Sequence, residues 1–431
     1  MSDVDVAELP AFPFLSPRAQ PFVPVGEPDL ARLDGPVTRV RLPFGGWAWL
    51  VTRHADVRAL LRAPGLSSNP YRPGFPVLNP IPPEQESAAG AFIYLDGVEH
   101  SRLRKMLLPE FMLRNIRRIE PLIEQTVVDA LERMRAAGPP ADLISSFALP
   151  VTSMTICHLL GVPYAEHERF QRQSLAIMDR ASGPAEINAA LGDLGALLFE
   201  LIQAKRVEPG DDLLSRLTVD YVVPGELGVE ELLGIGMLLL IAGHETTANM
   251  IGLSVLALLE HPEHLAALRD DPERAPDLVE ELLRYLTVVR AGLPRLALED
   301  IEIGGQRIRA GEGVVAMLPL ANRDPAVFPD GDRLDPGRAD VHQHLAFGFG
   351  VHQCIGQPLA RAELRIALVE LARRLPDLRC AVPAGEVPWR PNAVTFGLAE
   401  LPVTWATRPA PPGSDDAARA GDAGADRAGR R

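Results

Sequence analysis

One cysteine of the sequence lies in a setting that could activate its sulfur. Cys354 belongs to the segment FGFGVHQCIG, residues 347–356, where three glycines surround it and a helical pattern begins just after it. Glycine allows positive φ, and the start of a helix offers unpaired N–H groups and a positive dipole end. A thiolate there would be stabilised by N–H···S contacts. Alternatively, Cys354 is an ordinary buried cysteine that packs as an apolar side chain. For Cys157 and Cys380, which lack such a glycine-rich setting, we keep that interpretation.

A second group of polar residues interrupts an apolar helical stretch. The run AGHETT, residues 242–247, follows LLGIGMLLLI, and polar side chains in such surroundings need partners. Thr246 is expected to donate a hydrogen bond to the carbonyl of Ala242 and to open the helix locally. Ala242 and the small Gly243 would let a flat cofactor approach, with room for dioxygen. The alternative is an ordinary crossing point between helices. A zinc H-E-x-x-H site is excluded because residue 248 is Ala.

The elements that would position these residues are mostly helices. Helical periodicity predicts helices at roughly 54–62, 98–108, 115–137, 149–160, 165–180, 186–206, 229–260, 262–269, 275–286 and 357–374. Strands are expected at 37–42 and 47–52, in a strand–turn–strand around Gly304 and Gly305, and in a terminal hairpin at 392–406. The sequence therefore predicts a mainly α protein with a small β portion. We expect one domain over residues 1–407 and a disordered tail over 408–431.

The composition excludes several classes of function. The 431 residues carry a formal net charge of −14, whereas nucleic-acid binding needs a basic surface. The three cysteines are too few for a disulfide framework and fit a reducing compartment. The most apolar run, Leu232–Gly243, has twelve residues, too few to cross a bilayer. With no secretory signal visible at the N-terminus, we expect a cytoplasmic protein that binds neither nucleic acid nor membranes.

These patterns resemble cytochromes P-450, in particular their soluble bacterial members. The family's loop pattern, F-x-x-G-x-x-x-C-x-G, is matched by Phe347, Gly350, Cys354 and Gly356. Residues 242–247 match its oxygen-binding motif, A-G-x-E-T-T, and the resemblance extends over nearly the whole chain. It implies the triangular helical body of that fold, with haem b between the long central helix and the helix after Cys354.

The resemblance implies a role for each motif residue. Cys354 would ligate the haem iron as a thiolate, which favours O–O cleavage, and Phe347 would shield its sulfur. Thr246 would hold the oxygen intermediate and its water, while Glu245 would feed protons inward. Two buried haem propionates need charged, hydrogen-bonding partners. The residues expected to bind them are His100, Arg104, Arg295 and His352.

A pair of charges one helical turn apart completes the family pattern. Glu281 and Arg284 can pair on a helix, and such pairs are otherwise common on protein surfaces. In the family this pair is buried and completed by a later arginine, here Arg338. Residue 334 is Leu where the family usually has Phe, a difference in packing. We expect the three charged residues to be structural and required for haem incorporation.

Basic residues gather on the segments that flank the cysteine loop. They form either a solvated face or a docking patch for an acidic ferredoxin, whose encounter complementary charge would speed. Electrons would then come from NAD(P)H through a ferredoxin reductase and the ferredoxin. The residues of this basic patch are Arg102, Lys105, Arg114, Arg117, Arg118, Arg361 and Arg365.

The substrate is expected to be an apolar small molecule, such as a polyketide or terpenoid. Most of the expected pocket residues are apolar, which is also typical of ordinary core. We expect a monomeric monooxygenase that hydroxylates or epoxidises a secondary metabolite. The alternatives are a peroxide-driven or coupling-type haem-thiolate oxidase and a non-catalytic haem-binding partner protein, but the motifs whose loss would favour them are intact. The pocket residues are Phe92, Ile93, Leu239, Leu240, Thr247, Val288, Val289, Leu293, Val394 and Phe396.

Overall fold

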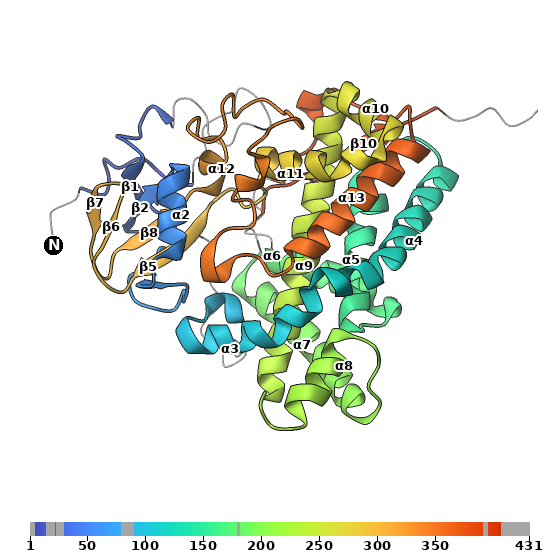
Figure 1. The fold of residues 1–431 in the computed structure, drawn as a ribbon. Helices are drawn as coiled ribbons and strands as arrows, with labels where there is room; N and C mark the ends of the chain where they lie inside the picture. The colour runs from blue at the N-terminus through green and yellow to red at the C-terminus, as the bar shows by residue number, and fades with distance from the viewer. Residues whose placement is uncertain are drawn as a thin grey trace, which may run out of the picture.

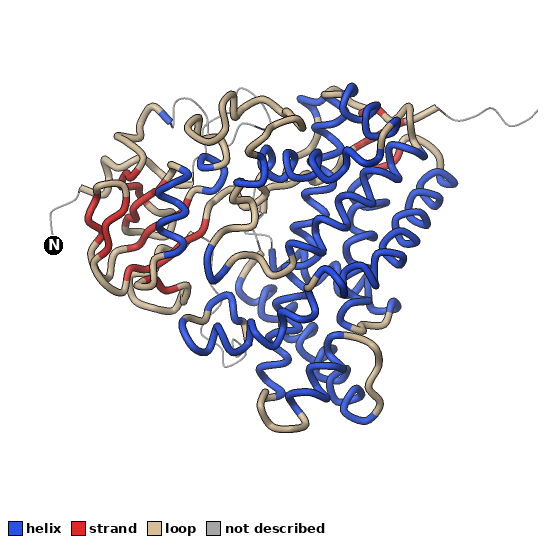
Figure 2. Tube along the Cα trace, in the orientation of Figure 1, coloured by secondary structure: helices blue, strands red, loops and turns tan. Residues whose placement is uncertain are grey.

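Helices gather in one large part of the molecule and strands in a smaller part beside it, which gives a triangular outline (Figures 1 and 2). The computed structural model describes residues 5–13, 22, 30–78, 90–178, 182–390 and 395–406. The tail expected at 408–431 and the pocket residue Val394 lie outside these residues. Within the residues that the structure describes, no helix combines the length and the apolar character that a bilayer span requires.

The helical part confirms the predicted periodicity. Apolar residues spaced three to four apart give each helix a face that packs on its neighbours. The helices are α2 (His54–Arg62), α3 (Gly97–Leu107), α4 (Leu113–Ala137), α5 (Leu149–Leu160), α6 (His167–Met178), α7 (Pro184–Val207), α8 (Leu213–Leu217), α9 (Val229–Glu260), α10 (Pro262–Asp270), α11 (Ala275–Leu286), α12 (Leu318–Ala321) and α13 (Gln357–Arg374).

The central element is α9, which has 32 residues. It is buried on nearly all sides, as expected of a helix that is apolar all round. Helices α5, α7, α10, α11 and α13 pack against it. Helix α13 packs on both α9 and α4 (Figure 1). The cysteine loop directly precedes α13, so this packing fixes the position of the loop relative to α9.

The strands form three sheets, two of them in the smaller part and the third, which contains β10, beside α10 and α13 in the helical part (Figure 1). The largest has the strand order β1-β2-β8-β5-β3, with β2 and β8 parallel and the other pairs antiparallel. The other two have the orders β4-β10-β9 and β6-β7. The strands are β1 (Val37–Arg41), β2 (Trp47–Val51), β3 (Leu66–Ser67), β4 (Ala141–Asp142), β5 (Leu293–Ala297), β6 (Ile301–Ile303), β7 (Gln306–Ile308), β8 (Gly313–Ala316), β9 (Arg379–Cys380) and β10 (Pro402–Thr404).

One strand prediction is confirmed and one is corrected. Strands β6 and β7 form the predicted strand–turn–strand, and both turn glycines have positive φ, 56° at Gly304 and 78° at Gly305. The terminal hairpin expected at 392–406 is wrong as a local unit. Strand β10 instead pairs with β4 and β9, and the only hairpin-like pairing among the described residues of that region is a single bridge, Trp389–Leu398.

Candidate functional site

The cysteine loop is bent tightly against the end of α2. A Cβ atom on Gly350 would lie 2.2 Å from the carbonyl oxygen of Leu61, and the backbone there has a φ of 75°. Both the contact and the dihedral therefore require glycine. The loop is closed by a hydrogen bond in which the Cys354 N–H donates to the Phe347 carbonyl at 2.9 Å. The glycine spacing thus fixes where the sulfur lies, directly before α13.

The sulfur of Cys354 faces an internal space. The side chain is exposed, yet burial raises the pKa of its thiol, while the backbone amides of Gly356 and Gln357 and the charge of Arg104 act in the opposite direction. A side chain that is both exposed and surrounded by protein points into a cavity within the fold. The predicted N–H···S contacts are present. A bound metal cation would favour the thiolate, because a ligating cysteine must lose its proton.

The middle of α9 also faces an open space. Ala242 is exposed and Thr246 half-buried, whereas Glu245 and Thr247 are buried. The predicted hydrogen bond is present, with Thr246 Oγ1 donating to the carbonyl of Ala242 at 2.8 Å. An exposed alanine in the middle of a core helix marks a surface kept free for another group.

The role expected for Gly243 needs correction. A Cβ atom on Gly243 would lie 2.8 Å from Cδ1 of Ile156 in α5. Gly243 therefore lets α9 pack closely on α5 and does not turn its bare backbone toward a cofactor. Ala242 alone of the pair lies on the open face.

Glu245 is held by an arginine that the sequence did not reveal. Its carboxylate is buried and pairs with Arg390, whose Nη1 lies 2.5 Å from Glu245 Oε1. Arg390 also lines a cavity of about 1050 Å³ between α6, α7 and the middle of α9. A buried carboxylate requires a compensating charge, which is the signal that could have indicated a partner. The sequence could not say which arginine, because 145 positions separate the two residues.

The four residues expected to bind propionates lie together. The rings of His100 and His352 have centroids 4.0 Å apart. Burial, with the charges of Arg295, His100 and Arg104, lowers the pKa of His352 to about 3. Burial also lowers the pKa of Arg295 to about 10. The Nε2 atom of His100 is buried, and no described residue forms a hydrogen bond with it.

This cluster fits a dianionic cofactor. Crowded basic groups and an orphaned imidazole nitrogen are costly unless an anion joins them. Among the groups that shift these pKa values, Asp96 is the only acid near His100 and Arg295. Arg104 acts on the charge of the Cys354 sulfur as well, so the basic cluster and the thiol belong to one site. A haem group, with two propionates and an iron, matches both halves.

The charged triad has the predicted contacts. Glu281 and Arg284 are fully buried and form a bidentate pair, with N–O distances of 2.7 and 2.8 Å. Arg338 Nε approaches Glu281 Oε1 at 3.5 Å. The Arg284 guanidinium also donates to the carbonyls of Asn322 and Gly331, each at 2.8 Å. These bonds fasten the irregular segment that leads toward the cysteine loop.

The predicted substrate-pocket residues are only partly assembled. The N–H of Phe396 donates to the Val288 carbonyl at 2.9 Å, so two expected wall segments are adjacent. The Phe396 ring itself stacks on Trp389 at 4.9 Å and is covered by Arg290. Leu239, Leu240, Thr247 and Phe92 are buried, Ile93 is exposed, and Val288, Val289 and Leu293 are half-buried.

The basic patch is partly neutralised by neighbouring acids. Lys105, Arg114 and Arg117 are exposed and have no ion pair within the described parts of the chain, and the exposed apolar Met112 and Leu113 lie beside them in the sequence. The pairs are Arg102 with Glu99 and Glu231, Arg118 with Asp211, Arg361 with Glu280, and Arg365 with Glu120. Three of the seven predicted residues thus keep a free charge.

Comparison with known proteins agrees with this geometry. The family model described as Cytochrome P450 matches residues 211–377. The chain is 48% identical to the vitamin D3 dihydroxylase of Streptomyces griseolus and to the pentalenic acid synthase of Streptomyces avermitilis, over 92% of this chain and 97% of each relative. The crystal structure of CYP105P1 in complex with filipin I matches with a TM-score of 0.85 and 42% identity, covering 93% of this chain and 99% of that one.

Proposed function

The chain belongs to the cytochrome P450 family and is a monooxygenase, and from that premise we propose that it oxidises an apolar secondary metabolite with haem b ligated by Cys354. Relatives are named for acting on vitamin D3 and for making pentalenic acid, and a similar structure holds filipin I. The observation that carries the assignment is the Cys354 thiol beside a cluster of two histidines and two arginines in which, among the described residues, His100 Nε2 has no hydrogen-bond partner.

The residues of the chain prepare the site for that cofactor. When bound, haem supplies the iron that activates dioxygen. The amides of Gly356 and Gln357 hold the Cys354 sulfur and draw off part of its charge. His100, Arg104, Arg295 and His352 bind the propionates, and Phe347 covers the sulfur. Glu281, Arg284 and Arg338 hold the preceding segment in place.

Proton delivery is the task of the α9 residues. With the cofactor bound, Glu245 would take up protons from the side of the Arg390-lined cavity beside α6 and α7, and the Thr246 hydroxyl would pass them toward the haem face. The ion pair links the Glu245 carboxylate to Arg390, and Arg390 lines the cavity. General acid catalysis of this kind raises reaction rates about 10²–10⁴-fold. Because both Glu245 and Thr246 are present, monooxygenation is favoured over the peroxide-driven alternative.

We predict that Arg390→Gln uncouples the reaction. The glutamine lacks the charge that holds Glu245, so product formation should fall about tenfold or more while NAD(P)H consumption continues and yields hydrogen peroxide. Product, peroxide and NAD(P)H are quantified in the same assay, together with the solvent isotope effect. Arg390→Lys keeps the charge and should recover most of the coupling. Equal coupling in Arg390→Gln and the wild type would contradict this role.

Electrons are proposed to reach the haem from NAD(P)H through a reductase and a ferredoxin that docks on the basic patch. The free charges of Lys105, Arg114 and Arg117, next to exposed apolar residues, suit an acidic partner. We place the protein in the cytoplasm, where its three free cysteines would stay reduced.

We predict that the double substitution Arg114→Gln, Arg117→Gln slows ferredoxin-driven turnover several-fold at low salt and flattens its salt dependence. Arg118→Gln should have the smaller effect, because Asp211 already pairs with Arg118. Stopped-flow reduction at several salt concentrations measures both. The control is Arg309→Gln, an exposed arginine on the sheet side. Loss of the same size in the control would remove the docking assignment.

The experiment that tests the function combines binding and turnover. Purified protein is screened with a library of polyketides, terpenoids and sterols for a change in haem spin state. Hits are incubated with NAD(P)H, ferredoxin and ferredoxin reductase under isotopically labelled dioxygen. A product carrying one labelled oxygen atom is expected. Products formed only with added peroxide, or only by coupling two substrate molecules, would favour the oxidase alternative.

A further inference from the structure

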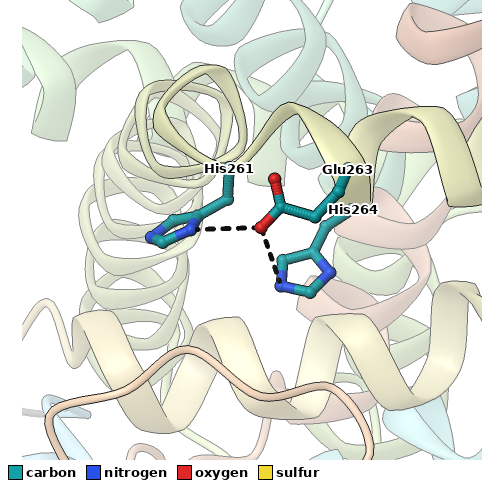
Figure 3. Close-up of side chains that lie close together, drawn as sticks. All are labelled: His261, Glu263 and His264. Carbon is teal, nitrogen blue, oxygen red and sulfur yellow. Dashed lines mark ion pairs between the residues drawn. The ribbon is translucent and has the colours of Figure 1, made fainter.

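Three side chains of metal-ligand type converge where α9 ends and α10 begins. His261 joins the two helices, and Glu263 and His264 lie in the first turn of α10 (Figure 3). Oε1 of Glu263 lies 3.5 Å from Nδ1 of His261 and 3.9 Å from Nε2 of His264. The two histidine nitrogens and the carboxylate oxygen all lie within 4.8 Å of one another. Figure 3 shows the carboxylate between the two rings.

The backbone holds this arrangement without help from a ligand. The His261 N–H donates to the carbonyls of Ala257 and Leu258, at 3.1 and 3.2 Å, at the end of α9. Pro262 begins α10 with its fixed φ, and the His264 N–H donates to the His261 carbonyl at 3.0 Å. The three donor side chains therefore project from one rigid corner, so little ordering would be needed on binding.

The spacing of the three side chains is close to that of ligands around one cation. An N–H···O hydrogen bond spans about 2.7–3.2 Å, and both separations are longer. Ligands held tetrahedrally at about 2.1 Å from a zinc ion lie about 3.4 Å apart. The two separations from Oε1 of Glu263, 3.5 and 3.9 Å, lie near that value. Two imidazoles and one carboxylate are also a donor set that Zn²⁺ accepts.

The surroundings leave the site available. Among the ion pairs of the described residues, Glu263 has only the two histidines as partners. The side chains of His261, Glu263 and His264 are 37%, 64% and 24% exposed, so water can complete the coordination. The negative end of the 32-residue α9 and the positive end of the nine-residue α10 meet at His261, so the helix dipoles oppose one another there.

A second His–Glu–His group in the chain lacks this availability. Glu280 lies 3.8 Å from His342 and 3.1 Å from His344. However, both of its oxygens accept hydrogen bonds from Arg361, at 2.6 and 2.9 Å. A cation would have to displace that guanidinium. The same residue types are thus present in two places, and of the two glutamates only Glu263, among the described residues, has no arginine bound to its carboxylate.

We propose that His261, Glu263 and His264 form a binding site for a divalent transition-metal ion, with Zn²⁺ as the best match. The ion would join the end of the oxygen-binding helix α9 to the first turn of α10. This site does not depend on the proposed function, because none of its residues takes part in holding haem.

The test uses full-length, tag-free holoenzyme treated with a chelator and then dialysed against ZnCl₂. We expect about one zinc per chain, counted by elemental analysis relative to haem iron, and a higher Tm in the presence of ZnCl₂, because a ligand that binds the folded state stabilises it. His264→Ala and Glu263→Gln should each weaken zinc binding about tenfold or more. The matched control, His342→Ala, should bind zinc as the wild type does.

Two results would overturn the site. One is wild-type protein that binds no more zinc than the double variant His261→Ala, His264→Ala. The other is His342→Ala losing as much zinc binding as His264→Ala. Unchanged haem absorption and circular dichroism show that each variant is folded. If His264→Ala does not fold, the milder substitution His264→Gln is measured in its place.

Discussion

Replacing Cys354 with serine is expected to abolish monooxygenase activity while leaving the fold in place. The hydroxyl keeps the size of the side chain, and the loop is closed by the Cys354 backbone N–H, which the substitution preserves. A serine oxygen is a much weaker electron donor than a thiolate and does not favour O–O cleavage in the same way. Any haem that remains bound should lose the red-shifted absorption that its carbon monoxide complex shows with a thiolate ligand.

The other two cysteines provide the controls. Cys157 is buried among apolar side chains, and burial raises the pKa of its thiol to about 12. Cys380 is half-buried in β9. Cys157→Ala and Cys380→Ser should retain both the carbon monoxide spectrum and product formation. A thiolate-type spectrum in Cys354→Ser, or its loss in Cys380→Ser, would show that the ligand has been assigned to the wrong cysteine.

Replacing Glu281 with glutamine is expected to cost about 3–5 kcal/mol of stability, because it leaves the buried charge of Arg284 without its partner. That is a large part of the roughly 5–15 kcal/mol that a folded protein has in total. The variant should accumulate poorly and contain little haem. Denaturant unfolding of the purified fraction measures the free energy, and the ratio of haem absorption to protein measures cofactor content.

An exposed pair of the same spacing is the control. Glu132 and Arg135 also lie three residues apart, at 3.2 Å, and Glu132 pairs with Arg374 as well, at 2.9 Å, but all three side chains are accessible to solvent, at 49%, 46% and 32%. Glu132→Gln should change the free energy of unfolding by less than about 1 kcal/mol. Comparable losses in Glu132→Gln and Glu281→Gln would mean that burial does not determine the effect.

The sequence was sufficient where local spacing decides the structure. The helix of residues 229–260, the Gly304–Gly305 turn and the Thr246 back-bond all follow from contacts within a few residues, and all were predicted. Helices α8 and α12 were missed, because five and four residues are too few to show helical periodicity.

The sequence was insufficient where a tertiary contact decides. Arg390 is brought to Glu245 by the packing of a C-terminal segment on α9, and nothing near either residue indicates it. From helical periodicity alone, Gly243 could lie on the side of α9 that faces a cofactor or on the side that packs against another helix. Only the position of Ile156 in the structure distinguishes the two possibilities. Strand β10 likewise takes partners from residues 141–142 and 379–380, far from its own neighbours.

The hydrogen bonds of Arg284 bear on the order in which the protein is assembled. Residues 322–349 contain almost no regular secondary structure, so such a segment would normally sample many conformations before its ligand arrives. Arg284 and Arg338 donate six hydrogen bonds to backbone carbonyls of this segment, at Asn322, Pro329, Asp330, Gly331 and Arg333. We therefore expect the chain to lose that freedom during folding, so that haem would bind to a segment whose conformation is already fixed. The affinity of the protein for haem would then be reduced less by the entropy cost of ordering this segment.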